Sequence, residues 1–369
     1  MKKSVITLAL VLVIALLTGC AGTPVVYYSD CTCPTGAHTE TTPVASTPAE
    51  TTAPVETTEP APVAEGAVKT GVAIVASAAE SKSAGDADGE AKYDVSVVAV
   101  TVDDNGVIQS CIIDSIGTSV MFDVSGAIVS DLTAEIPTKN ELGDAYNMKL
   151  YGNAVAEWYE QAAALASFAC GKTVEELRAG AVDETGHAVD ADLATTATIY
   201  LGGYVSAIEN AVANAQHLGA QAGDELKLAI SSSVDGSKNA DAENAGLCEL
   251  YTTAVALTMK DGVITSAQID AVQGKVNFDT TGTITGGTDG IFATKNMLGE
   301  QYGMKAWGGA IAEWNEQAAS FATYITGKTP AEVAGIAVDE STKPTDADLL
   351  TSVTIKIGEF QALVAKACN

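Results

Sequence analysis

The sequence predicts an α+β fold of two tandem homologous domains, each a small antiparallel sheet packed with helices. Three observations support this prediction. Most of the second half of the chain repeats the first half. Each copy opens with short segments of alternating apolar residues separated by turns, which is typical of antiparallel strands. Segments with helical periodicity follow the strands instead of alternating with them, which argues against a parallel βαβ sheet.

The repeat is long and keeps its register. The pattern T-K-N-x-L-G-x-x-Y-x-M-K begins at Thr138 and again at Thr294, and the pattern D-A-D-L-x-T-x-x-T-I begins at Asp190 and again at Asp346. Position 294 repeats position 138, and position 346 repeats position 190, so the offset is 156 residues in both cases. Solenoid repeats have periods of about 20–50 residues, so this unit is a whole domain.

Residues 1–19 are predicted to be a lipoprotein signal peptide. Two lysines follow Met1, and the apolar run from Val5 to Leu17 is too short to span a bilayer comfortably. The run ends in Leu-Thr-Gly-Cys20, which resembles the lipobox of bacterial lipoproteins. This resemblance implies that Cys20 takes a diacylglycerol and becomes the mature N-terminus, and two acyl chains give stable membrane anchoring.

Residues 20–65 are predicted to be the lipidated cysteine followed by a disordered linker. This segment is rich in Thr, Pro, Ala and Glu and shows no apolar periodicity. The remaining chain divides into predicted domains over residues 66–218 and 219–369, each long enough to bury a core of its own.

Within the first domain, each element follows from local pattern. The turn Asp-Asp-Asn-Gly at 103–106 predicts a hairpin, and Gly171 predicts the end of a helix whose apolar residues recur with helical period. In chain order we expect strands over 69–76, 93–102 and 107–113, helices over 151–169 and 174–179, a strand over 196–201 and a helix over 204–215.

Charge and histidine content exclude several function classes. A net charge of −28 argues against nucleic acid, since phosphate binding needs clustered Lys and Arg. Only three histidines occur, and His187 is replaced by Lys343 in the second copy. We therefore expect neither a duplicated histidine metal site nor a histidine-based catalytic triad. No nucleophile, acid and base set occurs in both copies.

The cysteines of the two domains are not duplicated between the copies. In an exported protein one disulfide within each domain is possible, pairing Cys111 with Cys170 and Cys248 with Cys368. Connectivity does not follow from sequence, so free thiols remain the alternative.

The second duplicated pattern supplies the candidate site. Each copy carries hydroxyl residues shortly before a predicted helix, where free backbone N–H groups and the helix dipole favour a phosphate. The alternative is that the threonines are strand residues and that the preceding aspartates only cap a turn. The candidates are Asp192, Thr195 and Thr198 in the first copy and Asp348, Thr351 and Thr354 in the second.

This pattern, with the D-x-G-x-I turn and the following helix, resembles the FMN-binding domains that carry covalent flavin at a D-x-x-S-G-A-T motif. The resemblance implies FMN attached by a flavin transferase through phosphoesters to Thr198 and Thr354, two per chain. Thr195 and Thr351 stand where the motif has serine, so they are the next candidate acceptors. Asp192 and Asp348 are implied contacts of the cofactor or the transferase.

The whole chain resembles the flavinylated surface lipoproteins of Gram-positive extracellular electron transfer. That resemblance implies a lipid-anchored carrier on the extracellular face of the cytoplasmic membrane. It would shuttle electrons from a membrane donor, such as a quinone-linked dehydrogenase, to extracellular acceptors. The alternatives are a surface lipoprotein that binds a ligand reversibly and a structural surface module without flavin.

A duplicated lysine and a duplicated tryptophan can each be interpreted in two ways. Lys139 and Lys295 either contact a phosphate or are solvated loop lysines. Trp158 and Trp314 either stack on a flavin or anchor a helix in the core.

Overall fold

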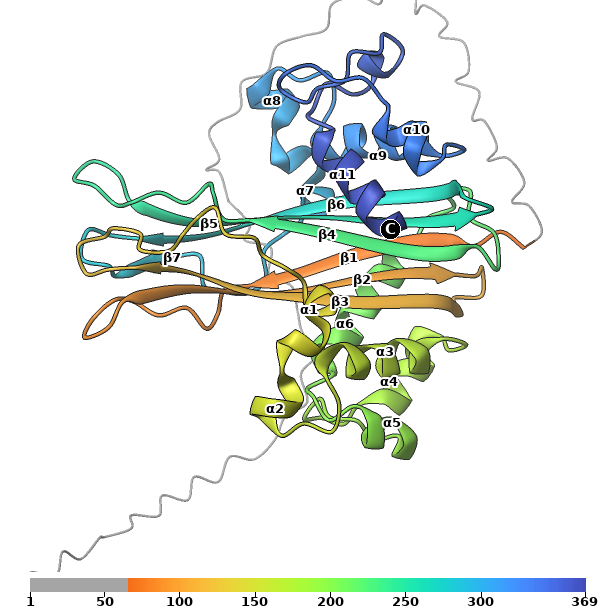
Figure 1. The fold of residues 1–369 in the computed structure, drawn as a ribbon, viewed down its shortest axis with the longest axis horizontal. Helices are drawn as coiled ribbons and strands as arrows, with labels where there is room; N and C mark the ends of the chain where they lie inside the picture. Colours follow the sequence, from red (N-terminus) through yellow and green to blue (C-terminus); the bar gives the residue numbers. More distant parts are fainter. Residues whose placement is uncertain (1–65) are drawn as a thin grey trace, which may run out of the picture. The chain divides into compact units, whose positions relative to one another are not determined.

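Two antiparallel sheets lie face to face at the centre of the structure, and each carries a layer of helices on its outer side (Figure 1). The computed structural model describes residues 66–369. The predicted signal peptide, the lipidation site Cys20 and the linker lie outside the described residues. The α+β fold with small antiparallel sheets is confirmed.

Each repeat supplies one sheet. The first has the order β1-β2-β3 and the second the order β4-β5-β6-β7, and all neighbouring strands are antiparallel. The strands are β1 (Lys69–Ser77), β2 (Gly89–Val102), β3 (Ile108–Phe122), β4 (Glu225–Ser233), β5 (Gly246–Lys260), β6 (Val263–Phe278) and β7 (Ile284–Gly286).

The helices of the two repeats follow one another in nearly the same order. The first repeat has α1 (Lys139–Leu142), η1 (Gly143–Tyr146), α2 (Met148–Gly152), α3 (Trp158–Ala169), α4 (Val174–Ala181), α5 (Ala191–Thr196) and α6 (Gly202–Ala213). The second has α7 (Lys295–Leu298), η2 (Gly299–Tyr302), α8 (Met304–Gly308), α9 (Trp314–Ile325), α10 (Pro330–Ala334), η3 (Leu349–Thr351) and α11 (Gly358–Cys368).

One predicted element of the first repeat is shortened and another is wrong. The helix expected over 151–169 begins only at Trp158, because Glu157 forms a capping box with Glu160 at that point. The strand expected over 196–201 is absent, since α5 extends to Thr196 and no β-ladder follows it. The other predicted strands and helices are confirmed, with shifts at their ends.

Three hydrophobic cores hold the layers together. Each repeat packs its helices on the outer face of its own sheet, so each has a core of its own. A third core lies between the two sheets and is shared by both repeats. The predicted boundary after residue 218 falls between α6 and β4. The assignment of 66–218 and 219–369 as separate domains stays a prediction.

The contact between the repeats is reciprocal. The backbone N–H of Ala84 donates to the carbonyl of Gly282, and the backbone N–H of Ala240 donates to the carbonyl of Gly126, each at 2.8 Å. Position 84 repeats as 240 and position 126 repeats as 282, so each copy makes the same bond to the other. A side chain at Gly282 would lie 2.6 Å from the Ala84 Cβ, and its φ of +68° also favours glycine. The repeats are therefore related by an approximate twofold axis.

The offset between the copies changes at the hairpin turn. Val102 pairs with Ile108 in the first sheet, whereas Met259 pairs with Ile264 in the second, so the second turn is one residue shorter. Along β2 and β5 the structural offset is therefore 157, whereas β1 and β4 keep the offset of 156. Tyr251 consequently takes the place of Asp94.

The disulfides considered above are not formed, since all four cysteines among residues 66–369 are free thiols. Cys248 lies in the core between the sheets, while Cys368 packs on the helix side of the second sheet. These two thiols are therefore on opposite faces. Burial raises the pKa of the Cys111 and Cys170 thiols, which keeps both protonated at neutral pH.

Candidate functional site

A buried glutamine fixes the backbone at Thr354. Gln317, on α9, is fully buried, and its side-chain oxygen accepts hydrogen bonds from the backbone N–H groups of Thr354 (2.7 Å) and Ile355 (3.2 Å). The same oxygen accepts from the Thr354 hydroxyl at 3.1 Å. These bonds replace a β-ladder, which explains why an extended segment before α11 is not a strand.

The first repeat contains the same arrangement. Gln161, on α3, accepts from the backbone N–H groups of Thr198 (2.7 Å) and Ile199 (3.1 Å). Its amide nitrogen donates to the Ala156 carbonyl at 2.8 Å, so both ends of this buried amide are satisfied. Sequence reasoning missed this pair of glutamines, although their duplication on an otherwise apolar helix face was a usable signal.

A cavity of about 600 Å³ lies beside Thr354. Four aromatic residues, three lysines and one glutamate line it, together with Thr354 and Gln317. Such a lining is unusual in a chain with a net charge of −28. The aromatic and charged lining residues are Tyr251, Tyr302, Trp314, Phe360, Lys295, Lys343, Lys356 and Glu359.

Lys295 forms the inner wall of this cavity within an aromatic cage. Its ammonium nitrogen lies 4.5 Å from the ring centre of Tyr251 and 4.8 Å from the ring centres of Tyr302 and Trp314. It also donates to the Tyr251 hydroxyl oxygen at 2.7 Å. Lys295 is only 4% exposed, and burial lowers its pKa to about 8. Its interpretation as a solvated loop lysine is therefore wrong.

The neighbours of Lys295 in the sequence explain how it is held. Thr294 caps α7, and the backbone N–H of Asn296 donates to the Asp270 carboxylate at 3.1 Å. The Asn296 side chain donates to the Ile269 carbonyl on β6 at 2.9 Å. The duplicated T-K-N motif is thus a tether of α7 to the sheet. Burial raises the pKa of the Asp270 carboxyl to about 6.

Both duplicated tryptophans are buried. Trp314 packs edge-on against Phe360, with ring centres 6.0 Å apart, and Trp158 packs edge-on against Tyr204 at 5.7 Å. Trp314 also lines the cavity beside Thr354, so it both anchors α9 and forms part of the cavity wall.

The remaining candidates lie differently. Asp192 and Asp348 are exposed and do not accept cap hydrogen bonds; Asp190 caps α5, and Asp346 makes the equivalent bonds before η3. Their side chains therefore cap no helix, although Asp348 directly precedes η3 and both backbone carbonyls accept from a threonine hydroxyl in the following turn. The Thr351 hydroxyl donates to the Asp348 carbonyl at 2.7 Å, and Thr351 does not line the cavity.

Thr195 repeats the Thr351 geometry in the first copy, donating to the Asp192 carbonyl at 2.7 Å. The geometry therefore separates Thr198 and Thr354, which are held by glutamines, from Thr195 and Thr351, which bond back into their own helical turns.

The first repeat keeps part of the lysine and aromatic lining that surrounds Thr354 in the second repeat. Lys139 lies 5.3 Å from the ring centre of Tyr146 and 5.1 Å from that of Trp158. At the positions of Tyr251, Lys343 and Lys356 it has, respectively, Asp94, His187 and Tyr200.

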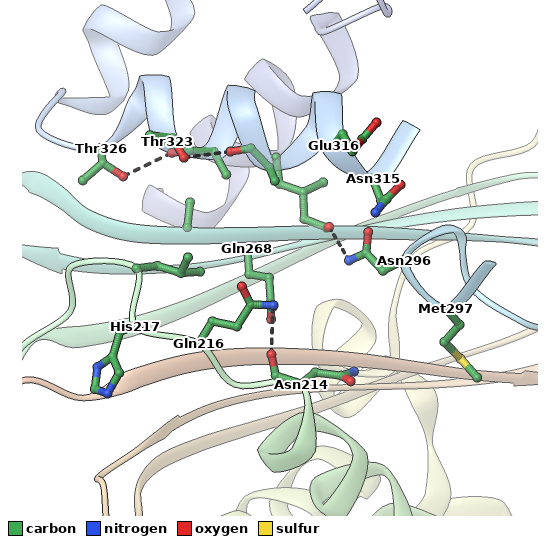
Figure 2. A pocket seen from close by; sticks show the side chains of 15 residues that line it. Asn214, Gln216, His217, Gln268, Asn296, Met297, Asn315, Glu316, Thr323 and Thr326 are labelled. Carbon is green, nitrogen blue, oxygen red and sulfur yellow. Dashed lines mark hydrogen bonds between the residues drawn. The ribbon is translucent and has the colours of Figure 1, made fainter. Parts of the chain in front are cut away.

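A larger cavity, of about 790 Å³, lies where the segment after α6 meets β6 and α9 (Figure 2). One of its amide side chains, that of Gln268, braces the two repeats. Gln268 donates to the Asn214 carbonyl at 3.0 Å, as Figure 2 shows, and Asn214 donates to the Val72 carbonyl at 3.0 Å. None of the predicted site residues lines this cavity.

Two further structural features bear on function. Within residues 66–369 no helix is both long enough and apolar enough to cross a membrane. The same part of the chain brings together no three His, Cys, Asp or Glu side chains that could hold a metal ion. Comparison of the chain with known protein families, curated proteins and solved structures finds no match.

Proposed function

We propose that this protein is a membrane-anchored extracellular electron carrier with FMN attached covalently to Thr198 and Thr354. The observation that carries the proposal is the cavity beside Thr354. It combines an anchored hydroxyl, aromatic walls and three lysines in a strongly acidic chain.

The lining fits the chemistry of FMN. Cavities of about 300–1,000 Å³ hold small ligands, and this one lies within that range. Tyr302, Trp314 and Phe360 offer faces and edges to a planar ring system. The lysine ammonium groups favour an anionic ligand such as a phosphate or a reduced flavin ring. When bound, the isoalloxazine supplies the electron-transfer chemistry.

The chain itself supplies attachment and orientation. Gln317 holds the Thr354 backbone and accepts a hydrogen bond from its hydroxyl, so the oxygen that forms the phosphoester has a fixed position. Gln161 does the same for Thr198. A phosphoester retains the cofactor outside the cell, where a reversibly bound one is lost as free FMN is diluted.

Attachment of this kind needs a flavin transferase as partner, and a carrier needs a membrane electron donor. The signal sequence and the lipobox-like Cys20 support a location at the outer face of the cytoplasmic membrane. The duplicated residues include no catalytic set, which favours a carrier over an enzyme with its own substrate.

Intact mass measured after treatment with a flavin transferase and FMN tests the proposal. We expect two FMN adducts on the wild type, one on Thr198→Val, one on Thr354→Val and none on the double variant. Thr195→Val and Thr351→Val are matched controls that should keep both adducts. A wild type without adducts that still binds FMN reversibly would instead support the ligand-binding alternative.

A further inference from the structure

The surroundings of Thr198 and Thr354 are equivalent in the repeat, but their charged residues differ. Around Thr354 the lining includes Lys343 and Lys356 in addition to the caged Lys295. The positions of Lys343 and Lys356 are occupied around Thr198 by His187 and Tyr200.

A third difference comes from the shorter hairpin turn of the second repeat. Because the offset changes there, Tyr251 stands at the structural position of Asp94. The carboxylate of the first repeat is thus replaced by a neutral hydroxyl that accepts a hydrogen bond from Lys295.

The aromatic content of the first site differs as well. Tyr200 is 59% exposed and packs against Gly186, where an added Cβ would come within 2.2 Å of the tyrosine ring. An uncharged aromatic residue therefore stands at the repeat position of Lys356.

We infer that the flavin on Thr354 has the higher reduction potential of the two, because cationic side chains of the second repeat stabilise its reduced form. This inference rests on the proposed function. Two electrons from a chemical reductant such as dithionite and one proton from water leave the ring with one additional negative charge. Lysines lining a partly desolvated cavity stabilise that charge more than a neutral imidazole or a phenol does.

Charges farther from the cavities largely offset one another. Lys275 lies 3.8 Å from Glu249 in the second repeat, and Lys92 pairs with Glu80 in the first. Lys92 also lies 3.9 Å from Asp94, so it offsets only part of the charge of that carboxylate. Glu359, where the first repeat has Gly203, opposes the lysines of the second site, but it is one carboxylate against two additional ammonium groups. The residues around Thr354 therefore remain more positively charged than those around Thr198.

Redox titration of singly flavinylated protein tests this inference. Full-length Thr198→Val carries flavin only on Thr354, and Thr354→Val carries it only on Thr198. We expect a higher midpoint potential for Thr198→Val. Exchanging the lining residues should move the two values toward each other. Lys343→His with Lys356→Tyr should lower the potential of the second site, and His187→Lys with Tyr200→Lys should raise that of the first.

Controls separate a local effect from a global one. Lys260→Tyr removes an exposed lysine that does not line the cavity, and it should leave the potential of the second site unchanged. High salt should reduce the difference between the sites, because exposed charges are screened. Adducts with equal or reversed potentials, or exchanges without effect, would overturn this inference alone. Absence of adducts would overturn the proposed function together with it.

Discussion

The rings of Phe122 and Phe278 stack on each other, with centres 4.2 Å apart and planes 11° apart. These two phenylalanines occupy the same position in the two repeats, at the ends of β3 and β6. A residue that packs against its own copy marks the twofold axis of an isologous contact. The interface between the repeats is therefore self-complementary.

This symmetry predicts the behaviour of one repeat expressed alone. Residues 219–369 would expose Ile230, Leu250, Val272 and Phe278, which are buried between the sheets in the whole chain. We expect this fragment to form a homodimer that reproduces the contact, because large exposed apolar faces favour association. Light scattering after gel filtration measures its mass. A stable monomer with cooperative unfolding would show that the second repeat does not need the shared core.

The buried glutamines are predicted to be positioning residues for the acceptor threonines. Gln317→Ala removes the acceptor for two backbone N–H groups and leaves a cavity, at a cost on the order of 2–4 kcal/mol. We expect mass spectrometry to show loss of the Thr354 adduct with the Thr198 adduct retained. Gln301→Ala, at an exposed position of the same repeat, is the control. Retention of both adducts in a folded Gln317→Ala protein would contradict this role.

Asp270 is predicted to make stability depend on pH. Burial raises its pKa from 3.8 to about 6, so the folded protein holds a proton there that the unfolded chain releases. The contribution of Asp270 to the free energy of unfolding should therefore fall as pH rises from 4 to 6, by about 3 kcal/mol for a shift of this size. Asp270→Asn should remove most of this fall, because an amide oxygen can still accept from Asn296.

Urea unfolding at pH 4, 5, 6 and 7 measures the effect. Glu300→Gln, an exposed change of the same charge, serves as the control and should keep the slope of the wild type. An identical slope in the wild type and Asp270→Asn would show that Asp270 ionises normally.

Lipidation at Cys20 remains a prediction of the sequence. Cys20→Ala should abolish acylation, and the protein should leave the membrane fraction or retain its signal peptide. Fractionation and N-terminal mass measurement check both outcomes. A variant that is still processed and membrane-bound would remove this assignment.

Sequence patterns predicted local structure well wherever backbone pairing is local. The alternating segments that became β1, β2 and β3 and the helix at α4 depend on periodicity and on turns that lie close in sequence. The predicted strand over 196–201 failed because its backbone groups bond to Gln161, which lies 37 residues away from Thr198. Composition alone does not reveal such a partner.

The candidate site was predictable only in part. Duplication identified Thr354 and Lys295, but the cage around Lys295 includes Tyr251, which has no counterpart at the 156-residue offset. A one-residue change in a hairpin turn concealed that correspondence. The face-to-face packing of the two sheets could not be predicted either, because a sequence repeat does not show whether its two copies contact each other.

The helices that hold Thr198 and those that hold Thr354 cover opposite outer sides of the paired sheets (Figure 1). A bulky partner that covers one of these sides leaves the other uncovered. Under the proposed function, each encounter with a donor or an acceptor would therefore reach the flavin on a single threonine. To present the other threonine to the same stationary partner, the molecule would have to turn over.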